Sequence, residues 1–118
     1  MTHDAFIEDA IATGARLGLS ALEADQRMVF LIAEAECLCD MECIDSFLDK
    51  YSPSWLPEAA LAFEAVGAIE IAAELRAVPL DIVNDDPRLD RLNALITARA
   101  GYDYGAIKRT VARRRVGG

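Results

Sequence analysis

The sequence has no apolar run close to the roughly 20 residues that a membrane-spanning helix needs. It has a single histidine, His3, and only 7% of its residues are aromatic. Its first nine residues, MTHDAFIED, carry acids where a secretory signal peptide needs bases. We therefore expect a cytoplasmic protein that has an aliphatic core and does not bind membranes.

The common sequence signatures of catalysis and phosphate binding are also missing. There is no G-x-S-x-G, no glycine-rich phosphate loop and no H-E-x-x-H. A nucleophile paired with His3 would have to be built at a chain end, which is a poor place for a rigid site. Some pair of carboxylates is expected by chance among twenty acids, so such a pair says little. The sequence predicts a protein that is not an enzyme and has no cofactor.

The charge of the chain is negative and unevenly spread. Twenty acids and twelve bases give a net charge of −8, and all the acids lie within residues 1–107. An acidic body repels nucleic acid directly and attracts basic partners. A short basic C-terminal tail, at about 108–118, is suited either to contact phosphate or to fold back onto the acidic body; its bases are Lys108, Arg109, Arg113, Arg114 and Arg115.

Helical periodicity runs through almost the whole chain, and no segment shows convincing strand alternation. We expect Asp4 to cap a helix over about 5–17, and Ser20 with Glu23 to form a capping box for the next. Pro57 and Gly67 are expected to bound a later helix, followed by one over about 68–77. The predicted fold is all-α, a compact single-domain bundle of about six helices spanning 1–118.

The last third of the chain begins with a predicted loop from Val78 to Pro87. Asp86 before Pro87 is typical of a helix N-cap, and the helix should run to about Ala100. Gly101 should end it, and Asp103 can cap the final helix.

A break in the helical pattern is predicted near Asp40–Cys43. The preceding apolar stripe includes Met28, Leu31 and Cys39, but its continuation would bring Glu42 and Asp49 to the same face. The next apolar residues lie on roughly the opposite side of a straight helix: Met41, Ile44, Phe47, Leu48 and Tyr51. One straight helix cannot bury both sets, so the chain should kink or break between them.

Three cysteines, Cys37, Cys39 and Cys43, lie within this region in a C-x-C-x3-C spacing. That spacing lacks the paired C-x2-C elements of structural zinc sites. A break would still allow Cys39 and Cys43 to approach Glu36 or Asp40, so a metal or thiol site is one interpretation. The interpretation that we favour has Cys39 in the core as a small hydrophobe and the other two filling space nearby.

Six acids with no base among them make up the candidate partner-binding site. Like charges this close repel one another by a few tenths of a kcal/mol per pair, whereas a solvated helix face usually mixes signs. An acidic surface that only keeps the protein soluble is the alternative. The six residues are Glu34, Glu36, Asp40, Glu42, Asp45 and Asp49, and a second patch could comprise Asp81, Asp85 and Asp86.

The middle of the chain resembles the bacterial DNA-mimic domain family, which is all-helical and largely of unknown function. The resemblance covers about residues 20–77, with a weaker echo after Leu89. Where the family has Asn-Asn-Gly-Gly, this sequence has Asp-Met-Glu-Cys at 40–43, at the predicted break. The residues that carry the likeness are Ile44-Asp45-Ser46-Phe47-Leu48, then Pro57-Glu58, then Ala62-Phe63-Glu64-Ala65-Val66-Gly67-Ala68.

The resemblance implies that the acids imitate duplex phosphates and occupy the DNA-binding surface of a regulator or nucleoid protein. An alternative from the residues alone is a structural or regulatory module that binds through an apolar surface, as a homodimer formed by its alanine-rich helices. In that case Trp55 or Leu56 would be an anchor. Trp55 could equally cover the protein's own core.

Overall fold

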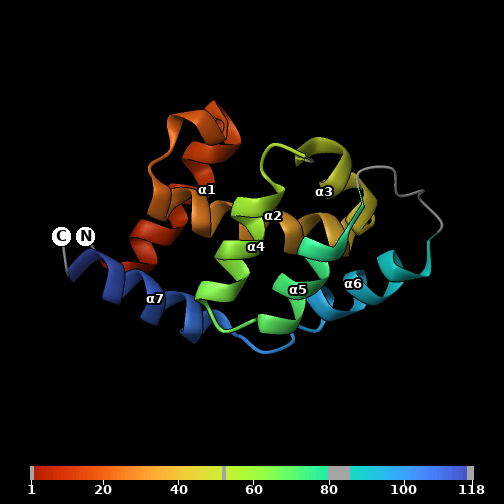
Figure 1. The fold of residues 1–118 in the computed structure, drawn as a ribbon. Coiled ribbons are helices and arrows are strands. Elements are labelled where there is room, and N and C mark those ends of the chain that lie inside the picture. The colour runs from red at the N-terminus through yellow and green to blue at the C-terminus, as the bar shows by residue number, and fades with distance from the viewer. Residues whose placement is uncertain (1, 52, 80–85, 117–118) are drawn as a thin grey trace.

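The computed structural model describes residues 2–51, 53–79 and 86–116, and within these ranges the only regular elements are helices joined by turns, with no strand (Figure 1). The helices pack into one bundle around a common core. The all-α prediction is confirmed, with one helix more than the six or so expected. The helices are α1 (His3–Leu17), α2 (Ala24–Met41), α3 (Ile44–Tyr51), α4 (Leu56–Ala65), α5 (Ile69–Ala77), α6 (Pro87–Thr97) and α7 (Tyr104–Val116), and a 3₁₀ turn over Leu19–Ala21 joins α1 to α2.

Helix α2 is the centre of the bundle, because α1, α3, α4, α6 and α7 all pack against it. Most of the predicted stripe is buried, including Leu31, Ile32 and Ala35, which have no exposed surface, whereas Leu38 is half-buried. Val29 and Phe30 are buried as well, outside that stripe. A helix that is apolar on more than one face must be packed against neighbours on each of those faces, and the surrounding helices do this for α2.

Helices α1 and α2 approach each other closely at Gly14. A Cβ atom added to Gly14 would lie 2.4 Å from the Phe30 ring, so only glycine leaves room for this contact. The caps of α1 and α2 differ from the prediction. The Thr2 hydroxyl, in place of Asp4, caps α1 by accepting from the Ala5 N–H.

The capping box of α2 is also shifted from the predicted Ser20–Glu23 pair. It consists of Glu23 and Gln26, and the helix begins at Ala24. Ser20 lies in the 3₁₀ turn that follows Gly18. Several residues here are able to cap a helix, and the turn decides which of them stands at the start of α2.

The predicted break between Asp40 and Cys43 is confirmed. Helix α2 ends at Met41 and α3 begins at Ile44. The first N–H of α3 is satisfied from outside, because Ile44 donates to the Asn93 side-chain oxygen at 2.9 Å. Asn93 lies on α6, so α6 both packs against the break and stabilises the new helix start.

The ends of α4 and α6 meet through two glycines. Gly67 and Gly101 both have positive φ, and a Cβ on Gly101 would lie 3.2 Å from the Gly67 carbonyl oxygen. Both were predicted to end helices, and this backbone contact gives them a second role. The predicted caps Asp86 and Asp103 are confirmed, since their carboxylates accept from Arg88 and Ala106 N–H groups.

Several large apolar side chains are exposed, including Met41, which the sequence analysis placed in the second apolar set and which exposes 77% of its surface. Leu17 and Leu61 each expose 55% of their surface and Ile11 exposes 37%. Leu61 matters most, because it lies on α4 away from the core-facing residues Ala62 and Phe63. Among the described residues no helix is long and apolar enough to cross a membrane.

We expect Gly14→Ala to lower the free energy of unfolding by about 1–3 kcal/mol, because the added methyl group overlaps the Phe30 ring. In a Phe30→Ala background the same change should be neutral or stabilise by about 1 kcal/mol, since alanine is the better helix former. Urea unfolding of the four proteins in this cycle measures the coupling. Equal effects of Gly14→Ala in both backgrounds would contradict the contact.

Candidate functional site

The structure divides the six predicted acids into two groups. Glu34 accepts a hydrogen bond from the Tyr51 hydroxyl and pairs with Lys50 at 3.1 Å. Glu36, two residues along α2, is paired with Arg99 at 2.9 Å and accepts from the Tyr102 hydroxyl. Both side chains are only 18% exposed. These two acids are therefore bound within the molecule and are not presented to a partner.

The tyrosines that hold these acids are affected in turn. Burial, together with the hydrogen bond to Glu34, raises the pKa of Tyr51 well above its usual value. Burial and the hydrogen bond to Glu36 raise the pKa of Tyr102 in the same way. Both hydroxyls therefore remain protonated donors at neutral pH, which keeps the two carboxylates satisfied near the core.

The other four acids lie around the α2–α3 turn. Asp40 and Glu42 are exposed at the end of α2, while Asp45 and Asp49 lie one helical turn apart on α3. None of the four has an ion pair with any residue that the structure describes. No base is therefore in direct contact with any of the four, although Arg99 interacts electrostatically with Asp40.

A fifth acid, Asp90, joins this group from α6. Its carboxylate acts electrostatically on Cys43, as those of Asp45 and Glu42 also do. Sequence analysis missed Asp90 because it is 45 residues from Asp45 and no local pattern connects them. We call the five residues the α2–α3 acidic patch: Asp40, Glu42, Asp45, Asp49 and Asp90.

The pKa of the Cys43 thiol responds to the negative charges of the patch. Its pKa is raised, first by the charge of Asp45, with smaller contributions from desolvation, a hydrogen bond to Asp45, and the charges of Asp90 and Glu42. A thiolate is an anion, so neighbouring carboxylates disfavour its formation. Because Cys43 is exposed, this effect is open to measurement.

The three cysteines have different environments. Cys39 is buried in the core, as predicted, and burial raises its pKa to about 12. The expectation that the other two fill space was wrong, because Cys37 and Cys43 are exposed. The Cys37 Sγ atom contacts the Met41 Sδ atom at 3.6 Å. Within the described part of the chain, no group of three or more histidine, cysteine and carboxylate side chains is arranged to hold a metal ion.

The predicted second patch is described only at Asp86. This residue caps α6 and pairs with Arg88 at 2.8 Å, and hydrogen bonds from Arg88 lower the pKa of Asp86 to about 2. Asp86 therefore has a local structural role. Asp81 and Asp85 lie outside the described residues.

The basic C-terminal segment belongs to a helix that packs on the acidic body. Along α7, Lys108 pairs with Asp4 at 3.2 Å, and the Arg115 guanidinium lies 4.1 Å from the centre of the Phe6 ring. Further pairs join Arg109 to Asp103 and Arg114 to Asp25. Of the two sequence alternatives, the described part of this segment folds back onto the body.

Trp55 lies in the turn before α4 and is half-buried. It packs against the core, and the Arg27 guanidinium lies 5.9 Å from its ring centre. Arg27 also pairs with Glu58 at 2.6 Å. These contacts fit the expectation that Trp55 covers the protein's own core.

Comparison of the chain with protein-family models, with curated proteins and with solved structures gave no match. The resemblance to the DNA-mimic domain family stays a prediction. The basis for a function is the charge, exposure and packing of the described residues.

Thiol labelling should distinguish the three cysteines. We expect Cys37 and Cys43 to react in the native protein and Cys39 only after unfolding, because Cys39 is buried and its pKa is raised to about 12. In a Cys37→Ser background, Asp45→Asn with Asp90→Asn should speed the reaction of Cys43 severalfold near neutral pH, since its pKa falls when the carboxylates are removed.

The matched control for this measurement is Glu8→Gln with Asp9→Asn, which removes two exposed acids on α1. It changes the net charge equally but lies on another helix. A rate increase of the same size in the control would show that Cys43 senses total charge and not the α2–α3 acidic patch.

Arg99 has a strained backbone conformation, and its side chain forms an ion pair with Glu36. Its φ is 52°, and Arg99 and Ala100 donate their N–H groups to Ile96 and Leu95 to close the end of α6. Glycine is the usual residue at such a position. The ion pair with Glu36 explains why arginine is accepted there.

We expect Arg99→Ala to be less stable than Arg99→Gly by about 1 kcal/mol, because both variants lose the ion pair but only glycine relieves the positive φ. Arg99→Gly should lie close to the wild type, since the half-exposed pair contributes less than about 1 kcal/mol. Urea unfolding measures both differences. Equal stability of the two variants would contradict the backbone argument.

Proposed function

We propose that this chain is an acidic protein-interaction module that carries out no chemistry. Its α2–α3 acidic patch would bind a basic surface of a partner such as a DNA-binding regulator or nucleoid protein and compete there with DNA. The observation that carries this proposal is a group of five carboxylates from the end of α2, from α3 and from α6, none of which forms an ion pair with a described residue.

Electrostatic attraction acts over a distance between such a patch and the basic side chains of a DNA-binding protein. Duplex DNA presents about one charge per 1.7 Å of its axis, and proteins that bind it gain much of their affinity from lysine and arginine contacts to phosphate. A rigid group of carboxylates competes for the same side chains. The attraction extends over about 8 Å at physiological salt, which makes it strongly dependent on ionic strength.

An exposed methionine lies within the patch and supports a contact role. Met41 exposes 77% of its surface, between Asp40 and Glu42 at the end of α2. Methionine is adaptable and is enriched at protein–protein contacts, so it can supply apolar contact inside a charged interface.

The proposed surface is smaller than the six acids first predicted. Glu34 and Glu36 are bound to tyrosines and bases, and they fix α2 against α3 and against the segment between α6 and α7. Asp90 takes their place on the surface. In this proposal the partner therefore contacts residues around the α2–α3 turn and on α6.

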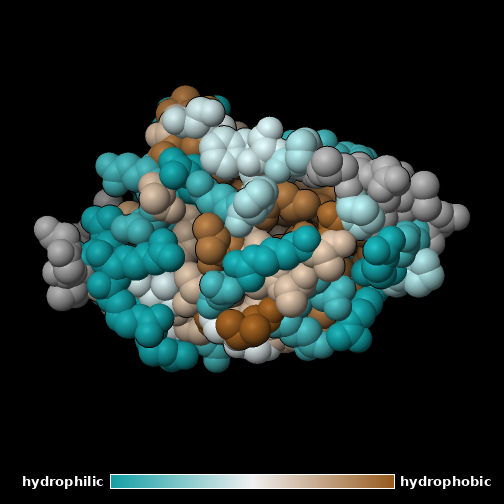
Figure 2. Space-filling view, viewed as in Figure 1, coloured by the Kyte–Doolittle hydropathy of each residue, from teal (hydrophilic) through white to brown (hydrophobic). Residues whose placement is uncertain are grey.

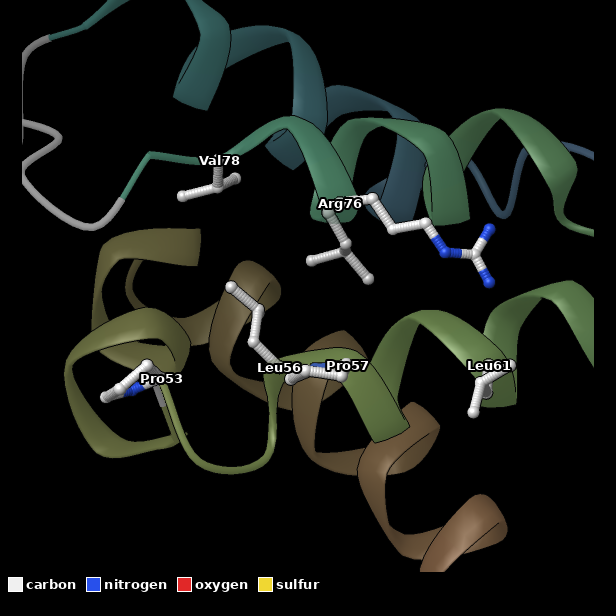
Figure 3. A pocket seen from close by; sticks show the side chains of 7 residues that line it. Pro53, Leu56, Pro57, Leu61, Arg76 and Val78 are labelled. Carbon is white, nitrogen blue, oxygen red and sulfur yellow. The ribbon is translucent and has the colours of Figure 1, made fainter.

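A second candidate function is a structural or regulatory homo-oligomeric module that binds through an apolar surface. A pocket of about 500 Å³ between α4 and α5 favours it, and Leu56, Leu75, Arg76 and Val78 are among its lining residues (Figure 3). Leu61, at the edge of the pocket, is more than half exposed. Trp55, the other proposed anchor, is not among the residues lining the pocket.

Charge variants test the leading proposal. We expect Asp45→Asn with Asp90→Asn to weaken retention of DNA-binding proteins from native lysate, so that they elute at lower salt, because two phosphate-like charges are lost. Glu8→Gln with Asp9→Asn is the control of equal charge and should elute at the wild-type position. Duplex DNA added to the wild-type complex should release the partner.

Two results would overturn the proposal. One is retention that does not change with salt concentration, because contacts between charged surfaces are screened by salt. The other is an equal loss of binding in both double variants, which would mean that total charge and not the α2–α3 acidic patch is responsible.

A further inference from the structure

The hairpin of α4 and α5 presents one continuous outward face. On α4, Pro57, Leu61 and Glu64 follow one another at intervals of four and three residues, so they lie on one side of the helix. On α5, Ile69, Ala73 and Arg76 have the same spacing. All six are exposed, and we call them the α4–α5 face.

This face is largely apolar. Leu61 exposes 55% of its surface and Ile69 exposes 60%. Figure 2 shows apolar surface on either side of a hydrophilic strip over α4 and α5, next to a hollow with an apolar floor. The hollow is the pocket of about 500 Å³ that Leu61, Leu75 and Val78 help to line. Several large apolar side chains gathered on one face are typical of an interaction site.

The only two charges of the face neutralise each other. Glu64 and Arg76 pair at 2.8 Å, and each side chain is 45% exposed. The acids that border the face are paired too: Glu58 with Arg27, and Glu70 and Glu74 with Arg91. The face is therefore neutral on a protein whose net charge is −8, in contrast to the α2–α3 acidic patch.

A face with one acid and one base is complementary to itself. Under a twofold axis, a residue that contacts a second residue of the partner copy is contacted by its own counterpart in return. Glu64 of each copy can then pair with Arg76 of the other, and both exposed pairs are kept. A basic or acidic partner gains nothing from such a face, whereas a second copy matches it.

We propose that the α4–α5 face binds a second copy of this chain in a twofold-symmetric dimer. Leu61 of each copy packs at the pocket of the other, and Glu64 and Arg76 pair across the interface. This inference rests on the second candidate function above and names its partner. The α2–α3 acidic patch lies on other helices and remains available to a basic protein.

Analytical ultracentrifugation of the full chain, at concentrations up to about 0.5 mM, tests the dimer. We expect Leu61→Glu to raise the dimer dissociation constant roughly 100-fold or more, because two leucines lose their contact and two charges enter the interface. Leu17→Glu is the matched control, since Leu17 is equally exposed but lies on α1. It should leave dimerisation unchanged.

Charge reversal tests the pairing itself. E64R alone places like charges opposite each other in the dimer, and so does R76E alone, so each variant should be monomeric. An equimolar mixture should form a mixed dimer, because one copy then carries two bases and the other two acids on this face. Circular dichroism and thermal melting confirm that each variant is folded before mixing.

The salt response separates this dimer from the proposed acidic contact. Salt screens the repulsion between two copies of charge −8, so the dimer should hold or strengthen as salt rises, whereas binding to a basic partner weakens. A wild-type chain that stays monomeric at about 0.5 mM overturns the dimer, as does Leu61→Glu that dimerises normally or a mixture that stays monomeric. If the chain is monomeric but Leu61→Glu abolishes binding to another protein, the dimer is overturned. The α4–α5 face is then a binding site for that other protein.

Discussion

The burial of α2 is the constraint that decides which carboxylates of this protein are paired within the fold and which are not. Five helices pack against α2, so a carboxylate on its sides must find hydrogen-bond partners or remain costly to desolvate. Glu34 and Glu36 each obtain a tyrosine hydroxyl and a base. Beyond Met41 the chain breaks, and α3 buries Ile44 and Phe47 in the core, whereas its acids form no ion pair with any described residue.

The net charge of −8 is therefore the sum of two surfaces with different charge patterns. Around α4 and α5 the acids are paired with Arg27, Arg76 and Arg91, and the exposed surface between them is apolar. Around the α2–α3 turn none of the acids forms an ion pair with a described residue. One surface suits a neutral, self-complementary contact and the other a basic partner, and the two lie on separate elements of one small fold.

Much of the fold could be predicted because its signals are local. Apolar spacing gave the helical class, and the shift of the apolar stripe located the break before Ile44. Asp86 and Asp103 were identified as caps because each stands directly before a helix. The predicted capping box at Ser20 was wrong, since neighbouring residues have similar capping ability and a 3₁₀ turn selects Glu23.

The amino-acid pattern is enough to predict that the chain is helical, where it breaks and that acids gather at the break, because these properties depend on residues within a few positions of one another. The packed structure was needed to show that Asp90 joins the acids, that Glu36 is bound by Arg99 from 63 residues away, and that Leu61 faces outward. Such contacts depend on how helices are placed against each other. The apolar period of one helix shows that it has a face to bury but not which neighbour covers it.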